Sequence, residues 1–451
     1  MTPTGTAPPR QALGMLTRAL HVQDFTPLPD PPVSSDPLGW PGYPAQLLDA
    51  RRRTGAAQAV IAGHARIGGQ RCVLAVFSFD FLGGSMGAAE GELLAQAIDC
   101  AQHRGLPLVT VARSGGARMQ EGPLSLLQMS RVAGGLARLA AAGVPHVAVV
   151  DDPTTGGVWA ALVAAADIVL GRAGAQVAFA GTRLLPGVDR PPTASTAEGK
   201  HALGFLDAVV ADHELTDVLA GYLNLLSPAT RGEPSPPPPP QLAPEQPTQS
   251  HNGWGSVQAA RSSTRRTAQD YLARYLSDRQ PLWGDRVGGV DSQVDCGFGR
   301  REGRTIAYVC QRGGPVGAVG FRTAHRLLAL AGRLHLPIVT FVDTAGADNS
   351  PEAERHGVGT AIAMLLQQLA ATTAPVLSVV VGQGVSGGAI ALINPDNMWM
   401  APDSYLAVTA PEAAAAILKR QGHHVPQLAE QLALSPAAVQ QLHLSRGMLT
   451  P

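Results

Sequence analysis

The sequence predicts an α/β protein built from two similar domains in tandem. Residues 106–110 (LPLVT) recur almost unchanged at 336–340 (LPIVT), and each run enters a turn of small residues. Pro145 and Pro375, which are also 230 residues apart, each begin an apolar run that ends at paired glycines. A period this long is that of a whole domain and not of a repeat unit of about 20–50 residues. Strands and helices alternate in both copies, which is typical of layered α/β domains.

Composition and charge exclude several classes of protein. The 451 residues suffice for two domains with separate cores. Because the formal net charge is +0, we expect no nucleic-acid partner. No apolar run is long enough to cross a membrane and no leader pattern stands out, so we expect a cytoplasmic protein. The 4 cysteines lack paired spacing, so we expect buried thiols and neither disulfides nor a metal site.

The first domain is assigned to residues 56–226. Residues 1–55 are rich in proline and lack periodicity, so we interpret them as an arm that is poorly ordered or wraps around the domain. Apolar and β-branched runs predict strands, and apolar residues spaced three or four apart predict helices. The expected strands are 73–79, 106–112, 146–150, 168–170 and 177–180, and the expected helices are 88–104, 124–142, 158–165 and 215–226.

Residues 227–255 are expected to link the two domains. The five prolines from Pro236 to Pro240 favour a polyproline II spacer, with an SH3-type ligand as the alternative. The second domain, 256–451, is predicted to contain a helix at 257–276, a strand hairpin at 296–311, helices at 322–333, 359–371 and 411–420, strands at 336–342, 376–381, 397–400 and 405–409, and two short helices within 426–442. Pro411 and Glu412 suit the first turn of a helix.

The stretch from Gly382 to Gly388 (GQGVSGG) matches three kinds of site. It fits a G-x-G-x-x-G dinucleotide turn, although no acidic residue ends the next strand as such a site requires. It also fits a G-x-S-x-G nucleophile elbow centred on Ser386. The partners for such a triad would be Asp396 or Asp403 with His423 or His424.

In the third interpretation the glycines themselves are the working groups. Successive N–H groups at a helix start, unshielded by side chains, form an oxyanion hole. The matching pairs are Gly156-Gly157 in the first copy and Gly387-Gly388 in the second. The duplication favours this interpretation, because Thr155 occupies the position that an elbow serine would need in the first copy. We expect Arg118 and Glu121 to brace the neighbouring turn as an ion pair.

Several longer strings resemble the carboxyltransferase of bacterial acetyl-CoA carboxylase. In the first copy, Phe81–Gly87 (FLGGSMG), Ser114–Gly122 (SGGARMQEG) and Asp152–Gly157 (DPTTGG) resemble its β subunit. The second copy is similar to its α subunit in the segments Gly284–Arg286, Phe341–Thr344, Ser386–Ala389 and Pro411-Glu412. The resemblance implies two crotonase-like ββα-spiral domains, a fused β–α arrangement.

The resemblance also implies a function. The chain would move a carboxyl group from carboxybiotin to an acyl-CoA, giving malonyl-CoA or a homologue. Gly156-Gly157 would stabilise the thioester oxyanion and Gly387-Gly388 the biotin ureido oxyanion. The implied partners are a biotin carboxyl carrier protein, a biotin carboxylase and at least one further copy of this chain. The implied substrate-binding residues are Ser114, Gly115, Gly116, Ala117, Arg118, Gly84, Ser85, Met86, Thr155, Thr344, Gly346 and Ala389.

The sequence departs from the family pattern at several points. The usual four-cysteine zinc ribbon has no counterpart before the first domain. In the second domain, Ala345, Val358 and Ala413 replace the proline, glutamine and glycine that the family carries there. These departures keep two alternatives open. One is a biotin-independent malonyl-thioester decarboxylase or acyltransferase, and the other is a non-catalytic carboxylase subunit.

Overall fold

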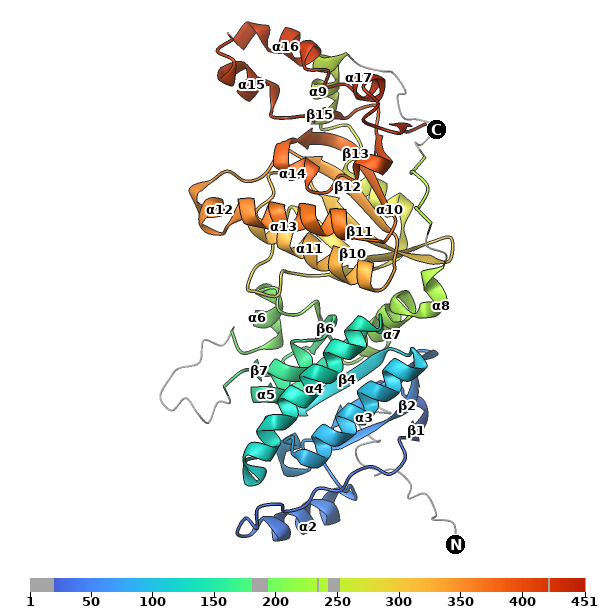
Figure 1. The fold of residues 1–451 in the computed structure, drawn as a ribbon, viewed down its shortest axis with the longest axis vertical. Helices are drawn as coiled ribbons and strands as arrows, with labels where there is room; N and C mark the ends of the chain where they lie inside the picture. The colour runs from blue at the N-terminus through green and yellow to red at the C-terminus, as the bar shows by residue number, and fades with distance from the viewer. Residues whose placement is uncertain (1–19, 181–193, 233–234, 242–251, 421, 451) are drawn as a thin grey trace. The chain divides into compact units, whose positions relative to one another are not determined.

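The computed structural model describes residues 20–180, 194–232, 235–241, 252–420 and 422–450. The chain divides into two compact units, Met1–Ala229 and Thr230–Pro451, and each has the mixed α/β architecture that the sequence predicts (Figure 1). In the described ranges no helix is long and apolar enough to span a membrane.

The first unit contains an 8-stranded sheet in the order β1-β2-β3-β4-β5-β6-β8, with β7 paired to β5 outside this path. The first three strands pair antiparallel and the remainder pair parallel. The strands are β1 (Gln23–Pro27), β2 (Val60–Ile67), β3 (Gln70–Phe77), β4 (Leu108–Ser114), β5 (His146–Thr155), β6 (Ile168–Arg172), β7 (Val177–Ala178) and β8 (Ala208–Val210).

Two long helices, α3 (Ala88–Arg104) and α4 (Pro123–Ala141), lie side by side on one face of this sheet (Figure 1). Leu93, Leu94 and Ile98 of α3 pack into the core against the sheet, mainly over β2 and β3. Burying such a side chain contributes about 1.5–3 kcal/mol, so this layer holds α3 in place. The other helices are α2 (Tyr43–Thr54), η1 (Leu82–Gly84), η2 (Met119–Glu121), α5 (Gly156–Val158), η3 (Trp159–Val163), α6 (Ala197–Ala202), α7 (Leu215–Leu226) and α8 (Pro228–Arg231). The boundary between the two units falls within α8.

The second unit repeats this topology. Its 8-stranded sheet has the order β16-β14-β13-β12-β11-β10-β9, with β15 paired to β13. The strands are β9 (Ser277–Leu282), β10 (Val294–Arg301), β11 (Arg304–Gln311), β12 (Ile338–Thr344), β13 (Val376–Val385), β14 (Met398–Met400), β15 (Tyr405–Ala407) and β16 (Gly447–Met448).

Helices α11 (Ala318–Arg333) and α13 (Val358–Ala371) form the second unit's counterpart of α3 and α4 (Figure 1). Trp254 packs into the two apolar clusters that join the C-terminal helices to the end of β13. The remaining helices are α9 (Gly253–Arg261), α10 (Ala268–Tyr275), α12 (Pro351–Arg355), α14 (Ser386–Ile390), η5 (Pro395–Asn397), α15 (Pro411–Ile417), η6 (Gly422–His424), α16 (Val425–Gln431) and α17 (Pro436–Gln441).

Of the two alternatives for the N-terminal arm, the described part fits the segment that wraps around the domain, because it contains α2 and β1, which pairs with β2. Two other expectations need correction. The single helix predicted at 257–276 is two helices, α9 and α10. The break occurs because the Thr267 side chain accepts the Asp270 N–H and the Asp270 carboxylate accepts the Thr267 N–H, a capping box that starts a new helix. Part of the predicted linker, 242–251, lies outside the described residues.

The second correction concerns how the two glycine pairs correspond. Strand β4 pairs Leu108 with His146, and β12 pairs Ile338 with Val376, so the offset of 230 residues persists in the strand register. Strands β5 and β13 then end at Thr155 and Val385, again 230 apart. Gly156 therefore corresponds to Ser386 and Gly157 to Gly387, one residue away from the alignment of glycine with glycine.

Candidate active site

The turn after β4 and the loop before α3 are joined by backbone hydrogen bonds. The Gly115 N–H donates to the carbonyl of Gly83 (2.9 Å), and the Met86 N–H donates to that of Gly116 (2.8 Å). The Arg118 N–H donates back to the Met86 carbonyl (2.9 Å). The structure thus brings the two predicted substrate-binding segments together into one substructure.

Hydroxyl groups reinforce this turn from inside. The Ser114 Oγ donates to the Gly84 carbonyl (2.6 Å) and accepts the Gly116 N–H (3.0 Å). The Thr155 Oγ1 donates to the Ser114 carbonyl (3.3 Å), which ties the end of β5 to the same turn. Ser114 and Met86 are fully buried. Their side chains therefore support the turn from inside the unit.

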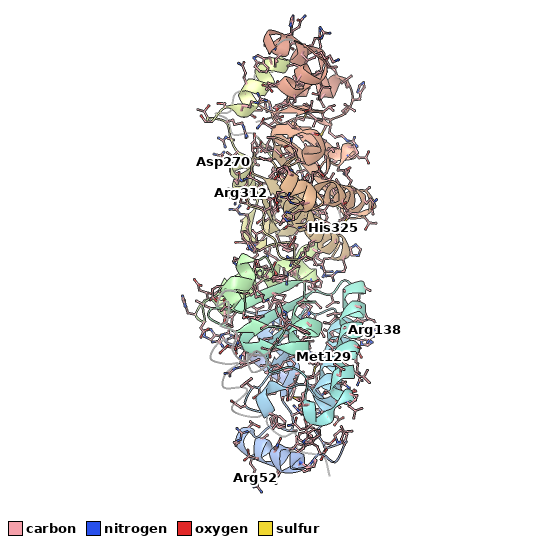
Figure 2. All side chains as sticks on the ribbon, turned by 90° about the vertical axis from the view of Figure 1, so that its left-hand side faces the viewer. Arg52, Met129, Arg138, Asp270, Arg312 and His325 are labelled. Atoms are coloured by element: carbon pink, nitrogen blue, oxygen red, sulfur yellow. The ribbon has the colours of Figure 1, made fainter. Side chains whose placement is uncertain are left out.

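The turn also contacts the start of α5 through glycines. Gly116 and Gly156 have φ values of 105° and 63°, a region that favours glycine. A Cβ on Gly156 would lie 3.3 Å from the Gly116 Cα. A Cβ on Gly157 would lie 2.8 Å from the Cε of Met129, which is on α4 (Figure 2). Two backbone segments thus approach each other with no side chain between them.

Some of the backbone N–H groups at this contact already donate a hydrogen bond, and others have no acceptor among the described residues. The Gly156 N–H donates to the carbonyl of Phe179 (3.0 Å), and the Gly116 N–H is held by Ser114. Within the described residues, no acceptor is found for the N–H groups of Ala117 and Gly157. Gly157 lies in the first turn of α5, where N–H groups have no intrahelical acceptor. The predicted donor pair Gly156-Gly157 is thus corrected, because Gly156 is already used, and Ala117 and Gly157 are the available donors.

Arg118 does not face a substrate, because its side chain is 0% exposed. Its guanidinium forms ion pairs with Glu90 (Nη2 to Oε1, 2.7 Å) and with Glu121 (Nη1 to Oε1, 3.4 Å). The ion pair with Glu121 that the sequence predicts is therefore confirmed. Arg118 Nε also donates to the Ser85 Oγ (3.0 Å). The role that remains for Arg118 at the site is to hold the turn in place from beneath.

The N-terminal segment completes this buried network. The Ser34 Oγ accepts from Arg118 Nη1 (3.0 Å) and donates to Glu90 (2.9 Å), while the Tyr43 hydroxyl donates to Glu121 (2.7 Å). Burial raises the pKa of Tyr43 above its usual value, and the bond to Glu121 adds to this, although Arg118 opposes it. For Arg118, burial lowers the pKa, but Glu90 and Tyr43 outweigh it and raise the pKa overall. Both groups therefore keep their protons.

The second unit builds the same turn with equivalent residues. The Thr344 Oγ1 donates to the Gly314 carbonyl (2.8 Å) and accepts the Gly346 N–H (3.1 Å). The Val316 N–H donates to the Gly346 carbonyl (3.0 Å), and the Asp348 N–H donates to the Val316 carbonyl (2.8 Å). Each of these bonds has a counterpart in the first unit, with Ser114 at the place of Thr344.

Gly388 brings the start of α14 against this second turn. A Cβ on Gly388 would lie 2.6 Å from the Ala347 nitrogen, which leaves no room for a larger residue without a backbone shift. No acceptor is found in the described part of the chain for the N–H groups of Gly387, Gly388 and Ala347. The predicted pair Gly387-Gly388 therefore stays a prediction, and Ala347 is a further candidate donor. Ala389, another predicted binding residue, is fully buried behind them. The second unit thus has the same kind of open donor pair as the first.

A buried amide and an ion pair support this second turn. Gln311, which is 0% exposed, donates through Nε2 to the Gly388 carbonyl (2.8 Å) and accepts the Asp343 N–H (3.2 Å). The Asp343 carboxylate accepts from Arg265 Nη2 (2.7 Å) and from the Gln383 N–H (3.0 Å). Burial raises the pKa of Asp343, although Arg265 opposes this. The residue at this position in the first unit is Arg113, whose Nε donates to the Asp152 carbonyl (2.5 Å).

The structure also addresses the alternative interpretations. Gly382 and Gly384 lie inside β13, so they cannot form the phosphate-binding turn of a dinucleotide site. Ser386 is exposed with φ 57°, as an elbow would require. No hydrogen bond joins Ser386 to a histidine in the described ranges, and the side chain of His423 is not described. Among the described residues no group of three or more potential metal ligands was found.

Sequence reasoning missed three members of the first unit's network: Ser34, Tyr43 and Glu90. Glu90 had a signal, because a glutamate three residues after the helix cap at Gly87 fits a capping pattern, and its Oε2 does accept the Gly87 N–H (2.9 Å). Ser34 and Tyr43 had none, since they lie 84 and 75 residues from Arg118 in a segment without periodicity.

Comparisons with known proteins identify the family. Residues 244–449 match a family described as acetyl co-enzyme A carboxylase carboxyltransferase-like. The chain is 40% identical to the acetyl-coenzyme A carboxylase carboxyl transferase subunits beta/alpha of Salinispora tropica over 446 residues, covering 94% of this chain and 79% of that protein. It is 34% identical over 407 residues to a probable biotin-dependent acyl-coenzyme A carboxylase beta3 subunit of Mycobacterium bovis, covering 88% and 81%.

Solved structures support the fold. A transcarboxylase 12S structure, described as a hexamer with methylmalonyl-coenzyme A bound, superposes with a TM-score of 0.79 at 19% identity, covering 98% of this chain and 86% of that one. The two tandem crotonase-like units and these relatives define a carboxyltransferase-type protein. The chain belongs to the acetyl-CoA carboxylase carboxyltransferase family, with β-type and α-type halves fused in one polypeptide.

Proposed function

We propose that this protein is the carboxyltransferase component of a biotin-dependent acyl-CoA carboxylase, in which it transfers a carboxyl group to an acyl-CoA to give malonyl-CoA or a homologue. The observation that carries this proposal is the open pair of backbone N–H groups in each unit, Ala117 with Gly157 and Ala347 with Gly387. Carboxyl transfer of this kind develops negative charge on two oxygens, one in each substrate. Two preorganised donor pairs fit that requirement.

The first pair is assigned to the thioester oxygen of the acyl-CoA. Its donors are backbone groups fixed by the buried network around Arg118, so they need no reorganisation as charge develops. The second pair is assigned to the biotin side. A carboxybiotin held there would supply the carboxyl group, and its ureido oxygen would gain negative charge as that group leaves. Ala347 and Gly387 would donate to that oxygen, each contributing a few kcal/mol on the usual scale of such donors.

The biotin group is proposed to arrive on a separate carrier protein that a separate biotin carboxylase loads. We further propose that the working assembly contains at least two copies of this chain. The β-type half retains its family motifs, and the α-type half carries the replacements Ala345, Val358 and Ala413. Use of biotin by the second half is therefore the step that most needs a direct experiment.

The reverse reaction provides this test. Purified protein is incubated with malonyl-CoA, with and without free biotin or carrier protein, and acetyl-CoA and carboxybiotin are quantified. Loss of malonyl-CoA that depends on biotin supports the proposal. Loss without biotin would identify a decarboxylase instead, and binding without turnover would indicate a non-catalytic subunit. A Gly359→Ala variant is the folding control, because a Cβ there meets no atom within 4 Å.

A further inference from the structure

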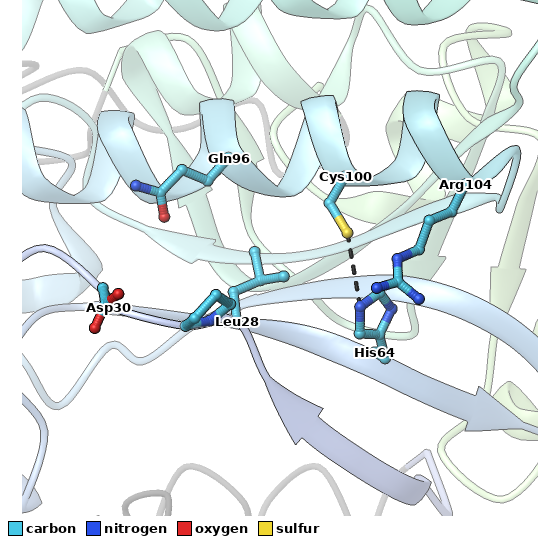
Figure 3. Close-up of a pocket in the computed structure, with 7 residues that line it drawn as sticks. Leu28, Asp30, His64, Gln96, Cys100 and Arg104 are labelled. Atoms are coloured by element: carbon cyan, nitrogen blue, oxygen red, sulfur yellow. Dashed lines mark hydrogen bonds between the residues drawn. The ribbon is translucent and has the colours of Figure 1, made fainter. Parts of the chain in front are cut away.

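A pocket of about 480 Å³ opens in the first unit, and none of its lining residues belongs to the glycine turns. It lies between α3 and the first strands (Figure 3). Its volume falls in the range typical of small-molecule sites. Nothing in the carboxyl-transfer chemistry uses it. The lining residues are Leu28, Pro29, Asp30, His64, Gln96, Cys100 and Arg104.

The chemistry of this pocket centres on a cysteine–histidine contact. Gln96, Cys100 and Arg104 are four residues apart along α3, so they share one helix face and point toward β2 (Figure 3). The Cys100 Sγ lies 3.7 Å from the His64 Nε2. Burial lowers the pKa of His64, and the cations of Arg104 and Arg71 lower it further. A neutral imidazole with its proton on Nδ1 leaves Nε2 free to accept a proton from the thiol.

The other cysteines lack these features. Cys72, Cys296 and Cys310 are buried, with exposures of 0%, 4% and 0%. Burial raises the pKa of Cys72 to about 12, and it raises the pKa of the other two thiols as well. Buried thiols of this kind are inert. Cys100 is only partly buried and lines an open pocket, so a reagent can reach it in the folded protein.

We propose that Cys100 and His64 form a thiol-modification site whose co-reactant is a small disulfide carrying carboxylate groups. The proton of the thiol passes to His64 Nε2 while the Cys100 sulfur attacks one sulfur of the disulfide. A new S–S bond forms to Cys100 and the original S–S bond breaks. The departing thiolate takes the proton back from His64, so one disulfide is exchanged for another without any further oxidant.

The charges around the pocket select for the acidic class of disulfide. Arg104 lines the wall next to His64, and Arg71 is close enough to act on the same ring. Asp30 is the one carboxylate among the lining residues. Among the lining residues Arg104 balances Asp30, and the added charge of Arg71 near His64 favours a negatively charged reagent at the thiol. Arg104 is exposed, so this preference weakens at high salt.

The test uses the full chain under native conditions with oxidised glutathione as the probe. Mass spectrometry is expected to find one glutathione per chain, on Cys100, removed by dithiothreitol. His64→Gln is expected to slow the reaction at least about tenfold, since general-base assistance is typically larger than this. His103→Gln, at an exposed histidine of the same helix, is the matched control and should react like the wild type. Cystamine, a cationic disulfide, should react several times more slowly than oxidised glutathione.

Three results would overturn the proposal. The first is that Cys100 forms no adduct. The second is that Cys72, Cys296 or Cys310 forms an adduct at a similar rate. The third is a His64→Gln variant that reacts as fast as the wild type while it retains the wild-type melting temperature. The site selectivity is measured on the wild-type protein, so it stands even if a variant folds poorly. Equal rates for oxidised glutathione and cystamine would contradict the acidic class of reagent.

Discussion

The turns after β4 and β12 have matching backbone hydrogen bonds, but their supports differ. In the first unit a fully buried arginine, Arg118, is paired with Glu90 and Glu121 and is tied to the N-terminal segment. In the second unit the equivalent position is Asp348, and the support comes from the neutral amide of Gln311 and an ion pair between Asp343 and Arg265. The donor geometry depends on the backbone, so the side chains beneath it can diverge as long as they satisfy its polar groups.

The starts of α3 and α11 show the same principle. Glu90 caps the Gly87 N–H from within α3. The position equivalent to Glu90 is Gly320, and a Cβ there would lie 2.7 Å from the carboxylate of Asp291. Asp291 comes from the preceding loop and accepts the Gly317 N–H (2.8 Å). In both units a carboxylate accepts the N–H at the start of the helix. In the first unit that carboxylate belongs to the helix itself, and in the second it belongs to the preceding loop.

The largest expected effect comes from breaking the first unit's charge network. Glu90→Gln would leave the fully buried Arg118 with Glu121, at 3.4 Å, as its one remaining ionic partner among the described residues. Removing one partner of a buried ion pair typically costs about 3–5 kcal/mol. Urea denaturation should show this loss. The control is Asp49→Asn, which removes an exposed pair with Arg53 and should change the free energy of unfolding by less than about 1 kcal/mol. Equal losses in both variants would show that the network does not support the unit.

The next effect concerns the close approach in the second unit. Gly388→Ala would place a Cβ 2.5 Å from the Gly346 carbonyl carbon, forcing the turn and the start of α14 apart. If Ala347 and Gly387 are the donors, the rate of carboxyl transfer should fall about 100-fold, as for loss of one oxyanion donor. The affinity for acyl-CoA, measured by calorimetry, should change little. A transfer rate like that of the Gly359→Ala control would contradict this donor assignment.

A third effect is the pH dependence of the first unit's stability. Burial lowers the pKa of His146 from 6.5 to about 4, so the folded state binds this proton less readily than the unfolded state. Stability is therefore complete above pH 6.5 and is lost as the pH falls toward 4, by about 2 kcal/mol at pH 5. Native-state hydrogen exchange of the β5 amides measures it. Position 376 of the second unit is valine, so the β13 amides should lack this term, and His146→Val should remove it from β5.

The smallest expected effect tests the link between the N-terminal segment and the turn. Tyr43→Phe removes the hydrogen bond to Glu121, which should cost about 1 kcal/mol. If losing this hydrogen bond weakens the binding of acyl-CoA at the turn, KM for acyl-CoA should rise about fivefold with kcat nearly unchanged. Steady-state kinetics separates the two constants. Arg53→Gln, on the exposed face of α2, is the control, and an unchanged KM in Tyr43→Phe would limit this segment to a structural role.

Much of the fold could be predicted from local patterns. The helix at 88–104 has the bounds that its periodicity predicts, and α7 begins and ends where expected. Failures arose where short polar signals were overlooked, as at Thr267, whose capping box divides a predicted helix in two. The two alternatives for the N-terminal arm could not be separated for a different reason. Its residues show little pattern of their own, because β1 is ordered by pairing with β2 and Tyr43 by its contacts with Glu121 and Arg118.

The sequence by itself determined the duplication, the order of the elements and the glycines at the two turns, because each depends on residue types and spacing along the chain. The tertiary structure alone decided which N–H groups remain available. The Gly156 N–H donates to the carbonyl of Phe179, while the N–H groups of Ala117 and Gly157 have no acceptor in the described part of the chain. Occupancy of a hydrogen bond depends on atoms that are distant in sequence and meet only on folding. The burial of Arg118 also depends on residues that are distant in sequence. The sequence therefore predicted a substrate contact for a side chain that the fold buries.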